Sequence, residues 1–215
     1  MWPETNIRKH ADGYLESNLL ALMRRDPKLA YRLVNLRPSL NWKIHLAADG
    51  HKTAEQFSGN GCSRFLHSRI SPMKSAETWA NSIRNTSETL VVLGVGLGYH
   101  LLALEIFDLP NALVIIDADV DLFGLAVRLT DLTSLLNNPR VHLLIGKTIL
   151  EVNAVLKNLG KGSITYREHL AATSLYPEYY QSIKDGLERL VFKYRLSASP
   201  EFGQGVIRLL DETKR

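Results

Sequence analysis

Apolar residues follow two different periods along the chain, and the change of period divides it into parts. Between residues 15 and 36 leucines recur every three or four positions, which predicts two helices separated at Pro27. Residues 40–46 and 51–57 instead alternate around a short turn, which predicts a β-hairpin. Residues 1–70 are therefore predicted to form a small α+β unit with its own mixture of helix and strand.

From residue 71 onward, strands and helices are predicted to alternate. Ser71 and Pro72 are a cap and a first helical residue, and four apolar runs follow, at residues 90–94, 113–117, 141–145 and 163–166. Each of these runs leads into a helical pattern, and Pro177 begins a long amphipathic helix that is predicted to cover the flank of the sheet. Continuous apolar strands of this kind are typical of a parallel sheet covered on both faces.

The predicted fold class is therefore α/β. Residues 71–200 are expected to form a Rossmann-like, methyltransferase-like parallel sheet with helices on both faces, preceded by the α+β unit. Residues 201–215 are expected to be a tail or the start of a following domain.

The most informative motif is the turn after the first strand of this sheet, which holds Gly94, Gly96 and Gly98. Glycines let the backbone approach a ligand closely, and a helix start offers unpaired N–H groups to phosphate. Asp117 ends the next strand, 23 residues after Gly94, close to the spacing of a ribose-binding acid. Tyr99 and His100 begin the helix after the turn and are further candidate contacts. These six residues are the predicted binding site for a nucleotide or nucleotide-sugar.

Other functions remain open from the residues alone. The G-x-G-x-G spacing resembles the first motif of S-adenosylmethionine-dependent methyltransferases, but Val92 stands where that family has an acid, which makes this cofactor the less favoured one. A non-catalytic interaction module is another alternative. No catalytic constellation is recognisable, and one cysteine with scattered histidines predicts no metal site.

Composition and charge limit the functions and locations expected of the chain. Residues 1–85 carry a net charge of +6 and the remainder −2, but no aromatic–basic repeat accompanies the positive charge, so nucleic acid is not favoured. The start of the chain is polar rather than like a signal peptide, and the longest uncharged apolar stretch is too short for a membrane span. A cytoplasmic location without a membrane span is expected.

The order of motifs resembles the N-terminal region of motility accessory factor proteins. The resemblance covers about residues 40–205 and is carried by Ser71–Trp79, by Leu93–His100 with its G-x-G-x-G-Y-H string, by Ile115–Phe123, by Leu144–Gly146 and by Leu175–Tyr180 with Phe202-Gly203. These bacterial glycosyltransferase-like proteins are implicated in adding nonulosonic acids, such as pseudaminic acid, to flagellin. The same superfamily looks related to an archaeal pterin diphosphokinase family.

The resemblance implies an accessory role rather than a complete enzyme. Family members are several hundred residues long, and their central, sialyltransferase-like domain follows the region seen here. The chain is therefore expected to be the N-terminal accessory domain of a flagellin glycosylation protein, with flagellin or other domains of a longer protein as partners. No catalytic residue is carried over, whereas the glycine turn and Asp117 match family positions. A pterin diphosphokinase-like enzyme is a further alternative.

Overall fold

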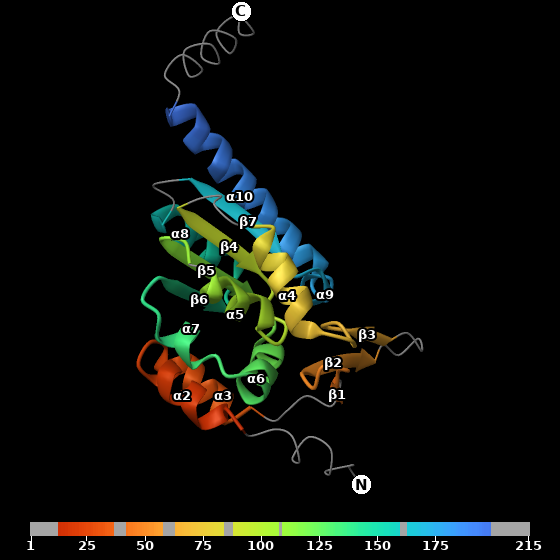
Figure 1. Cartoon of the computed structure of the whole chain (residues 1–215). Coiled ribbons are helices and arrows are strands. Elements are labelled where there is room, and N and C mark those ends of the chain that lie inside the picture. Colours follow the sequence, from red (N-terminus) through yellow and green to blue (C-terminus); the bar gives the residue numbers. More distant parts are fainter. Residues whose placement is uncertain are drawn as a thin grey trace, which may run out of the picture.

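A four-stranded parallel sheet lies at the centre of the molecule (Figure 1). A computed structural model of the chain describes residues 13–36, 42–57, 63–83, 88–107, 109–159 and 163–198. The strands of the central sheet are β4 (Thr89–Leu93), β5 (Ala112–Asp117), β6 (Val141–Ile145) and β7 (Ile164–Glu168). The accompanying helices are α4 (Pro72–Asn81), α5 (Tyr99–Ile106), α6 (Val120–Leu129), α7 (Thr133–Asn137), α8 (Ile149–Leu159), α9 (Leu170–Thr173) and α10 (Pro177–Ala198).

The strands of this sheet lie in the order β6-β5-β4-β7, and every pairing is parallel. Val92 of β4 pairs with Ile115 of β5 on one side and with Arg167 of β7 on the other. Numbered along the chain, this is the 3-2-1-4 order with which a doubly wound sheet begins. The carboxyl ends of β4, β5 and β7 consequently meet at one edge, where the glycine turn and Asp117 are found.

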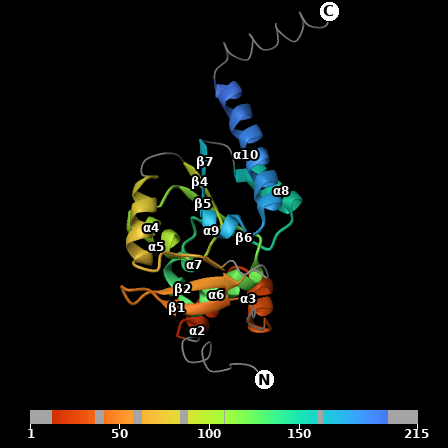
Figure 2. The ribbon, with the colours of Figure 1, turned by 90° about the vertical axis from the view of Figure 1, so that its right-hand side faces the viewer.

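Helices cover both faces of the sheet, which confirms the predicted fold class (Figure 2). Leu90 and Val92 of β4 face α4, α5, α6 and α7 in the larger core. Val91 and Leu93 face α8 and α10 in the smaller one. Because both sets of side chains are buried, the sequence of β4 is an uninterrupted apolar run rather than an alternation of apolar and polar residues.

The first part of the chain contains two helices and a small antiparallel sheet. The helices are α2 (Leu15–Met23) and α3 (Pro27–Val34), and the sheet has the order β1-β2-β3, with β1 (Trp42–Leu46), β2 (Lys52–Phe57) and β3 (Ser63–Phe65). The predicted helices and hairpin are thus present, whereas β3 was not expected from the sequence.

The two N-terminal helices pack on the central domain. Asn18 of α2 is fully buried, where its amide donates to the carbonyls of Val127 and Thr130 (both 2.8 Å) and its Oδ1 accepts the N–H of Leu132 (2.9 Å). Residues of α2, α3, β1 and β2 belong to the same apolar core as β4 and β5. The predicted domain boundary at residue 70 remains a prediction, and residues 201–215 lie outside the described part of the chain.

Local capping explains where several helices begin. Ser71 accepts the N–H of Lys74 (3.4 Å) at the start of α4, and Asp119 accepts the N–H groups of Asp121 (2.9 Å) and Leu122 (3.0 Å) at the start of α6. Before α8, Thr148 and Glu151 form the reciprocal capping box that their spacing predicts. The short helices α7 and α9 are too brief to give a readable period in the sequence.

Candidate functional site

The glycine turn, residues 94–98, joins β4 to α5 at the carboxyl edge of the sheet. Its three glycines have positive φ values, of 85° at Gly94, 53° at Gly96 and 88° at Gly98, and the whole turn is buried. Gly98 is the left-handed residue from which α5 begins. The backbone conformation therefore matches the glycine turn that the sequence predicts.

Two of these donors are bonded to side chains of the protein itself. The N–H of Val95 donates to Asp117 Oδ2 (2.6 Å), and the N–H of Leu97 donates to His67 Nε2 (2.8 Å). His67 lies between β3 and α4, so the N-terminal part of the chain reaches into the crevice where open α/β sheets take their ligands.

Asp117 is 1% exposed and holds together several backbone groups. Besides Val95, its carboxylate accepts the N–H of Asp119 (2.9 Å) and the O–H of Tyr180 (3.1 Å), while the Tyr180 oxygen accepts the N–H of Ala118 (3.1 Å). Burial raises the pKa of Asp117 to about 6, so the group is ionised at neutral pH. A ribose hydroxyl would have to displace Tyr180 or the turn to reach it, and its role in binding remains a prediction.

Three histidine rings pack against one another beside the glycine turn and form what we call the histidine cluster. Its members are His67, His100 at the start of α5, and His169 after β7, with ring centroids 4.7 Å apart for His67–His169 and 4.6 Å apart for the nearly parallel His100–His169 pair. Trp79 of α4 packs edge-on against His100 at 4.9 Å. The cluster therefore joins four elements from distant parts of the sequence.

The protons of the cluster can be placed from its hydrogen bonds. His100 donates from Nε2 to the carbonyl of Gly94 (3.1 Å), and His67 accepts at Nε2, so the proton of His67 lies on Nδ1. Burial, with mutual repulsion, lowers the pKa of His67 and His100 well below the usual value, and burial lowers that of His169 to about 4. The cluster is uncharged at neutral pH, and Nδ1 of both His100 and His169 is buried without a hydrogen-bond partner.

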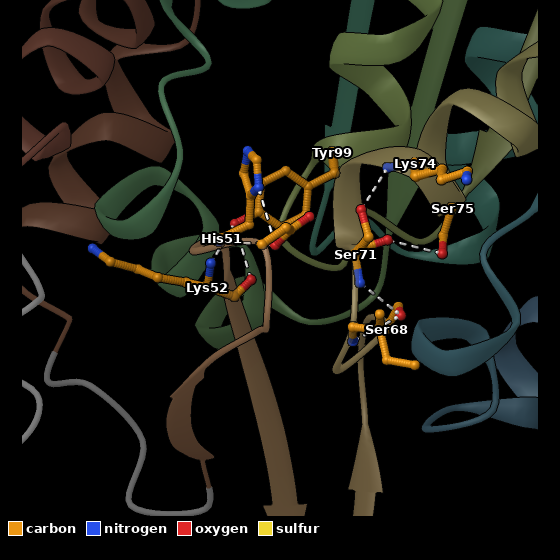
Figure 3. Close-up of polar contacts among 9 residues, drawn as sticks. His51, Lys52, Ser68, Ser71, Lys74, Ser75 and Tyr99 are labelled. Atoms are coloured by element: carbon orange, nitrogen blue, oxygen red, sulfur yellow. Dashed lines mark hydrogen bonds and ion pairs between the residues drawn. The ribbon is translucent and has the colours of Figure 1, made fainter.

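Tyr99 is directed at the small antiparallel sheet rather than at an open crevice. Its hydroxyl donates to the carbonyl of Lys52 (2.9 Å) and accepts the N–H of the same residue (3.1 Å), as Figure 3 shows. Its ring also packs edge-on against His51 and His67, at 5.6 and 5.1 Å between ring centroids. Tyr99 thus fixes β2 against α5 in the same way that His67 fixes the β3–α4 connection against the turn.

The faces of the three glycines are occupied by side chains. A Cβ added at Gly94 would lie 2.9 Å from Ala172 Cβ, and one at Gly98 would lie 2.7 Å from Leu132 Cδ2. A Cβ at Gly96 would lie 2.8 Å from His67 Nε2 and 3.0 Å from His169 Cε1. In this chain the close approach that glycine permits is made by the protein's own side chains.

The structure brings most of the predicted site together and adds residues that the sequence prediction missed. The turn, His100 and Asp117 are in contact, while Tyr99 faces the hairpin. The additional residues are His67, His169 and Tyr180. His169 directly follows β7 at the expected edge and lies three positions after the strand predicted over residues 163–166, so its position was a usable signal. His67 and Tyr180 carried no local signal, because one follows a three-residue strand and the other lies in an amphipathic helix.

Two further observations apply to the described ranges. No group of three or more His, Cys, Asp or Glu side chains there is arranged to hold a metal ion. None of the helices described is both long and apolar enough to span a membrane.

Comparison with known proteins identifies the family. Residues 42–190 match the family model of the glycosyltransferase Maf N-terminal domain. The chain belongs to the Maf glycosyltransferase N-terminal domain family. The predicted relationship to motility accessory factor proteins is thereby confirmed, and the matched range includes β1 to β7 and the first part of α10.

A solved structure agrees with this assignment at the level of the fold. The Maf glycosyltransferase from Magnetospirillum magneticum AMB-1 superimposes with a TM-score of 0.61 and 17% sequence identity, over 85% of this chain. The chain covers 35% of that protein, so it spans about a third of the length of this Maf relative. No curated protein matches the chain.

Proposed function

We propose that this Maf N-terminal domain serves flagellin glycosylation in the cytoplasm as a protein-docking part of a longer glycosyltransferase. In this role it holds flagellin or another part of the enzyme in position for transfer of a nonulosonic acid, and it neither binds the sugar nucleotide nor performs the transfer itself. The family membership supports a role in flagellin glycosylation. The filled crevice at the carboxyl edge of the sheet supports a role in docking rather than in nucleotide binding or sugar transfer.

The observation that carries this proposal is the filled crevice. A nucleotide at the glycine turn would use the N–H groups of Val95 and Leu97, but these already donate to Asp117 and His67. Displacing them would leave a buried carboxylate without one of its donors and break the contact of the histidine cluster with the turn. Each buried polar group left unpaired costs about 1–3 kcal/mol, which a ligand would have to recover before any net affinity appeared.

A surface suited to a protein partner lies on the two N-terminal helices. Leu20 and Met23 of α2 and Tyr31 and Val34 of α3 are exposed apolar residues, and basic residues such as Lys28 lie on the same helices. Exposed apolar groups interspersed with charge are typical of protein-interaction sites. We propose this α2–α3 surface as the docking face.

The first test asks whether a nucleotide binds. The chain is melted with CMP, UDP, GDP, ATP, UDP-N-acetylglucosamine and S-adenosylmethionine, each at 5 mM. A ligand present at 100 times its Kd stabilises a protein by about 2.7 kcal/mol, which is a shift of several degrees for a chain of this size. We expect no shift. A reproducible shift that Gly96→Asp abolishes would restore the nucleotide proposal, or the methyltransferase one if only S-adenosylmethionine acts.

The second test asks whether flagellin binds the α2–α3 surface. Purified flagellin monomer is titrated onto the immobilised chain, and the Tyr31→Ser, Val34→Ser double variant is compared with Leu150→Ser. Leu150 is a matched control because it is 82% exposed but lies on α8. We expect binding to weaken at least tenfold in the α2–α3 variant alone. Equal binding by both variants would contradict the proposed surface, and sugar transfer to flagellin by this chain alone would contradict the proposed role.

A further inference from the structure

The central sheet has one edge at which no further strand pairs within the described residues. Strand β7 pairs there with β4 alone, and it forms the end of the order β6-β5-β4-β7. The carbonyl of Ser163 accepts the N–H of Thr89 (3.0 Å), and the N–H of His169 donates to Leu93 (2.8 Å). Since backbone groups alternate along a strand, the N–H and C=O groups of Ile164 and Tyr166 point away from β4, toward the free edge.

A groove of about 620 Å³ runs along this edge, and we call it the edge groove. One wall is β7, and the other is the outer side of α10, with Glu188, Val191 and Phe192. Phe192 is 61% exposed, although apolar residues earlier on α10, such as Ile183 and Leu187, are fully buried. An apolar wall beside a strand whose outer backbone groups are not paired with another strand is the arrangement that binds an added β-strand.

The charged side chains that line the groove already have partners. Arg167 donates from its guanidinium to the carbonyl of Tyr166 (2.9 Å), a contact that an added strand would replace. Tyr166 donates its hydroxyl proton to Glu188 (3.2 Å), and Lys184 of α10 lies 3.5 Å from Glu168. At the carboxyl end of the strand, Trp79 donates its indole N–H to the carbonyl of Glu168 (3.4 Å). The groove therefore offers backbone groups and apolar surface to an occupant, whereas the carbonyl of Glu168 at its end is already taken by Trp79.

The handedness of the fold indicates where such a strand comes from. Helices α5, α6 and α7 lie on one face and carry the chain from β4 to β5 to β6, whereas α8 lies on the other face and carries it back across the sheet to β7. Helix α10 lies on the same face as α8 (Figure 2). Parallel crossovers are right-handed in about 98% of cases, so a helix on this face leads to a strand on the far side of β7.

We propose that the edge groove is the docking site of one β-strand, parallel to β7, which is supplied by the polypeptide that follows α10. The chain covers 35% of the solved Maf glycosyltransferase, so proteins of this family have additional polypeptide from which such a strand can come. Its backbone pairs with Ile164 and Tyr166, and its side chains cover Val191 and Phe192. The proposal rests on the family and the topology and is independent of the flagellin-docking role.

Hydrogen exchange measured by mass spectrometry tests this proposal. The full-length protein is compared with a version that stops after Ala198, which retains every described residue. Amides of residues 164–167 include both those bonded to β4 and those facing the groove. We expect the groove-facing amides to exchange at least tenfold more slowly in the full-length protein, with β4 and β5 unchanged.

A pair of variants supplies the control. In the full-length protein, Phe192→Glu is expected to remove most of the added protection. Leu150→Glu, at a residue that is also exposed but lies outside the groove, is expected to leave it intact. Equally fast exchange in the full-length and shortened proteins would overturn the proposal. Protection that rises with protein concentration would also overturn it, because the occupant would then be a second copy of the chain.

Discussion

The filled crevice predicts a specific energetic coupling between Gly96 and His67. In Gly96→Ala the new methyl group would lie 2.8 Å from His67 Nε2, closer than a Cβ is found to any heavy atom. His67 must move, and the movement breaks its hydrogen bond with the N–H of Leu97, which is 2.8 Å long. If the crevice were open to a ligand instead, the same methyl group would meet nothing in the unliganded protein.

The size of the effect follows from two contributions. A non-glycine residue in the left-handed region costs about 1–2 kcal/mol, and Gly96 has a φ of 53°. Loss of the buried hydrogen bond of Leu97 adds about 1–3 kcal/mol. The expected loss in the free energy of unfolding is therefore about 2–5 kcal/mol for Gly96→Ala.

A double-mutant cycle separates these contributions. Urea unfolding followed by circular dichroism gives the free energy of unfolding of the wild type, Gly96→Ala, His67→Ala and the double variant. Once His67 is removed, Gly96→Ala should cost little more than its backbone conformation, about 1–2 kcal/mol, so the coupling energy is the hydrogen-bond contribution of about 1–3 kcal/mol. Gly50→Ala is the matched control, because Gly50 has a φ of +84° and nothing lies within 4 Å of an added Cβ.

Two results would refute this reasoning. One is strict additivity of the two substitutions, since the side chain of His67 would then not occupy the space beside Gly96. The other is an equal loss in Gly50→Ala and Gly96→Ala, because backbone conformation alone would then account for the whole effect. Either result would reopen the crevice as a candidate nucleotide site.

Three further predictions concern the buried polar groups. Lowering the pH from 7 to 5 should destabilise the protein, because the pKa of His169 is lowered to about 4 and only the unfolded state takes up its proton as the pH falls below 6.5. This effect lowers the free energy of unfolding by about 2 kcal/mol, the other two cluster histidines add to the loss, and Asp117, with its raised pKa of about 6, offsets about 1 kcal/mol. Urea unfolding at each pH measures the net change. Asn18→Ala should cost about 3 kcal/mol in the same assay, because the N–H of Leu132 and two carbonyls lose their partner; a loss below 1 kcal/mol would contradict this. Tyr180→Phe should cost about 1–3 kcal/mol and leave far-ultraviolet circular dichroism unchanged, and an unaltered unfolding midpoint would show that its bond with Asp117 contributes nothing.

Much of the fold could be predicted from the sequence because it depends on neighbouring residues. The apolar run of β4 and the helix that Pro72 begins are encoded within a few positions, as are the caps at Asp119 and Thr148. The strand β3 and the helix α9 escaped prediction because three or four residues are too few to show a period. The family assignment likewise rested on short strings around the glycine turn.

The occupation of the crevice depended on contacts that no local pattern encodes. His67 reaches Leu97 across 30 positions of sequence, and Tyr180 reaches Asp117 across 63. The sequence by itself determined a turn with unusual backbone freedom and an acid at the end of the next strand. Only the tertiary structure decided that side chains from β3–α4, β7–α9 and α10 fill the space between them. The physical reason is that a glycine-rich turn accommodates any close neighbour, ligand or protein, and packing alone determines which one is there.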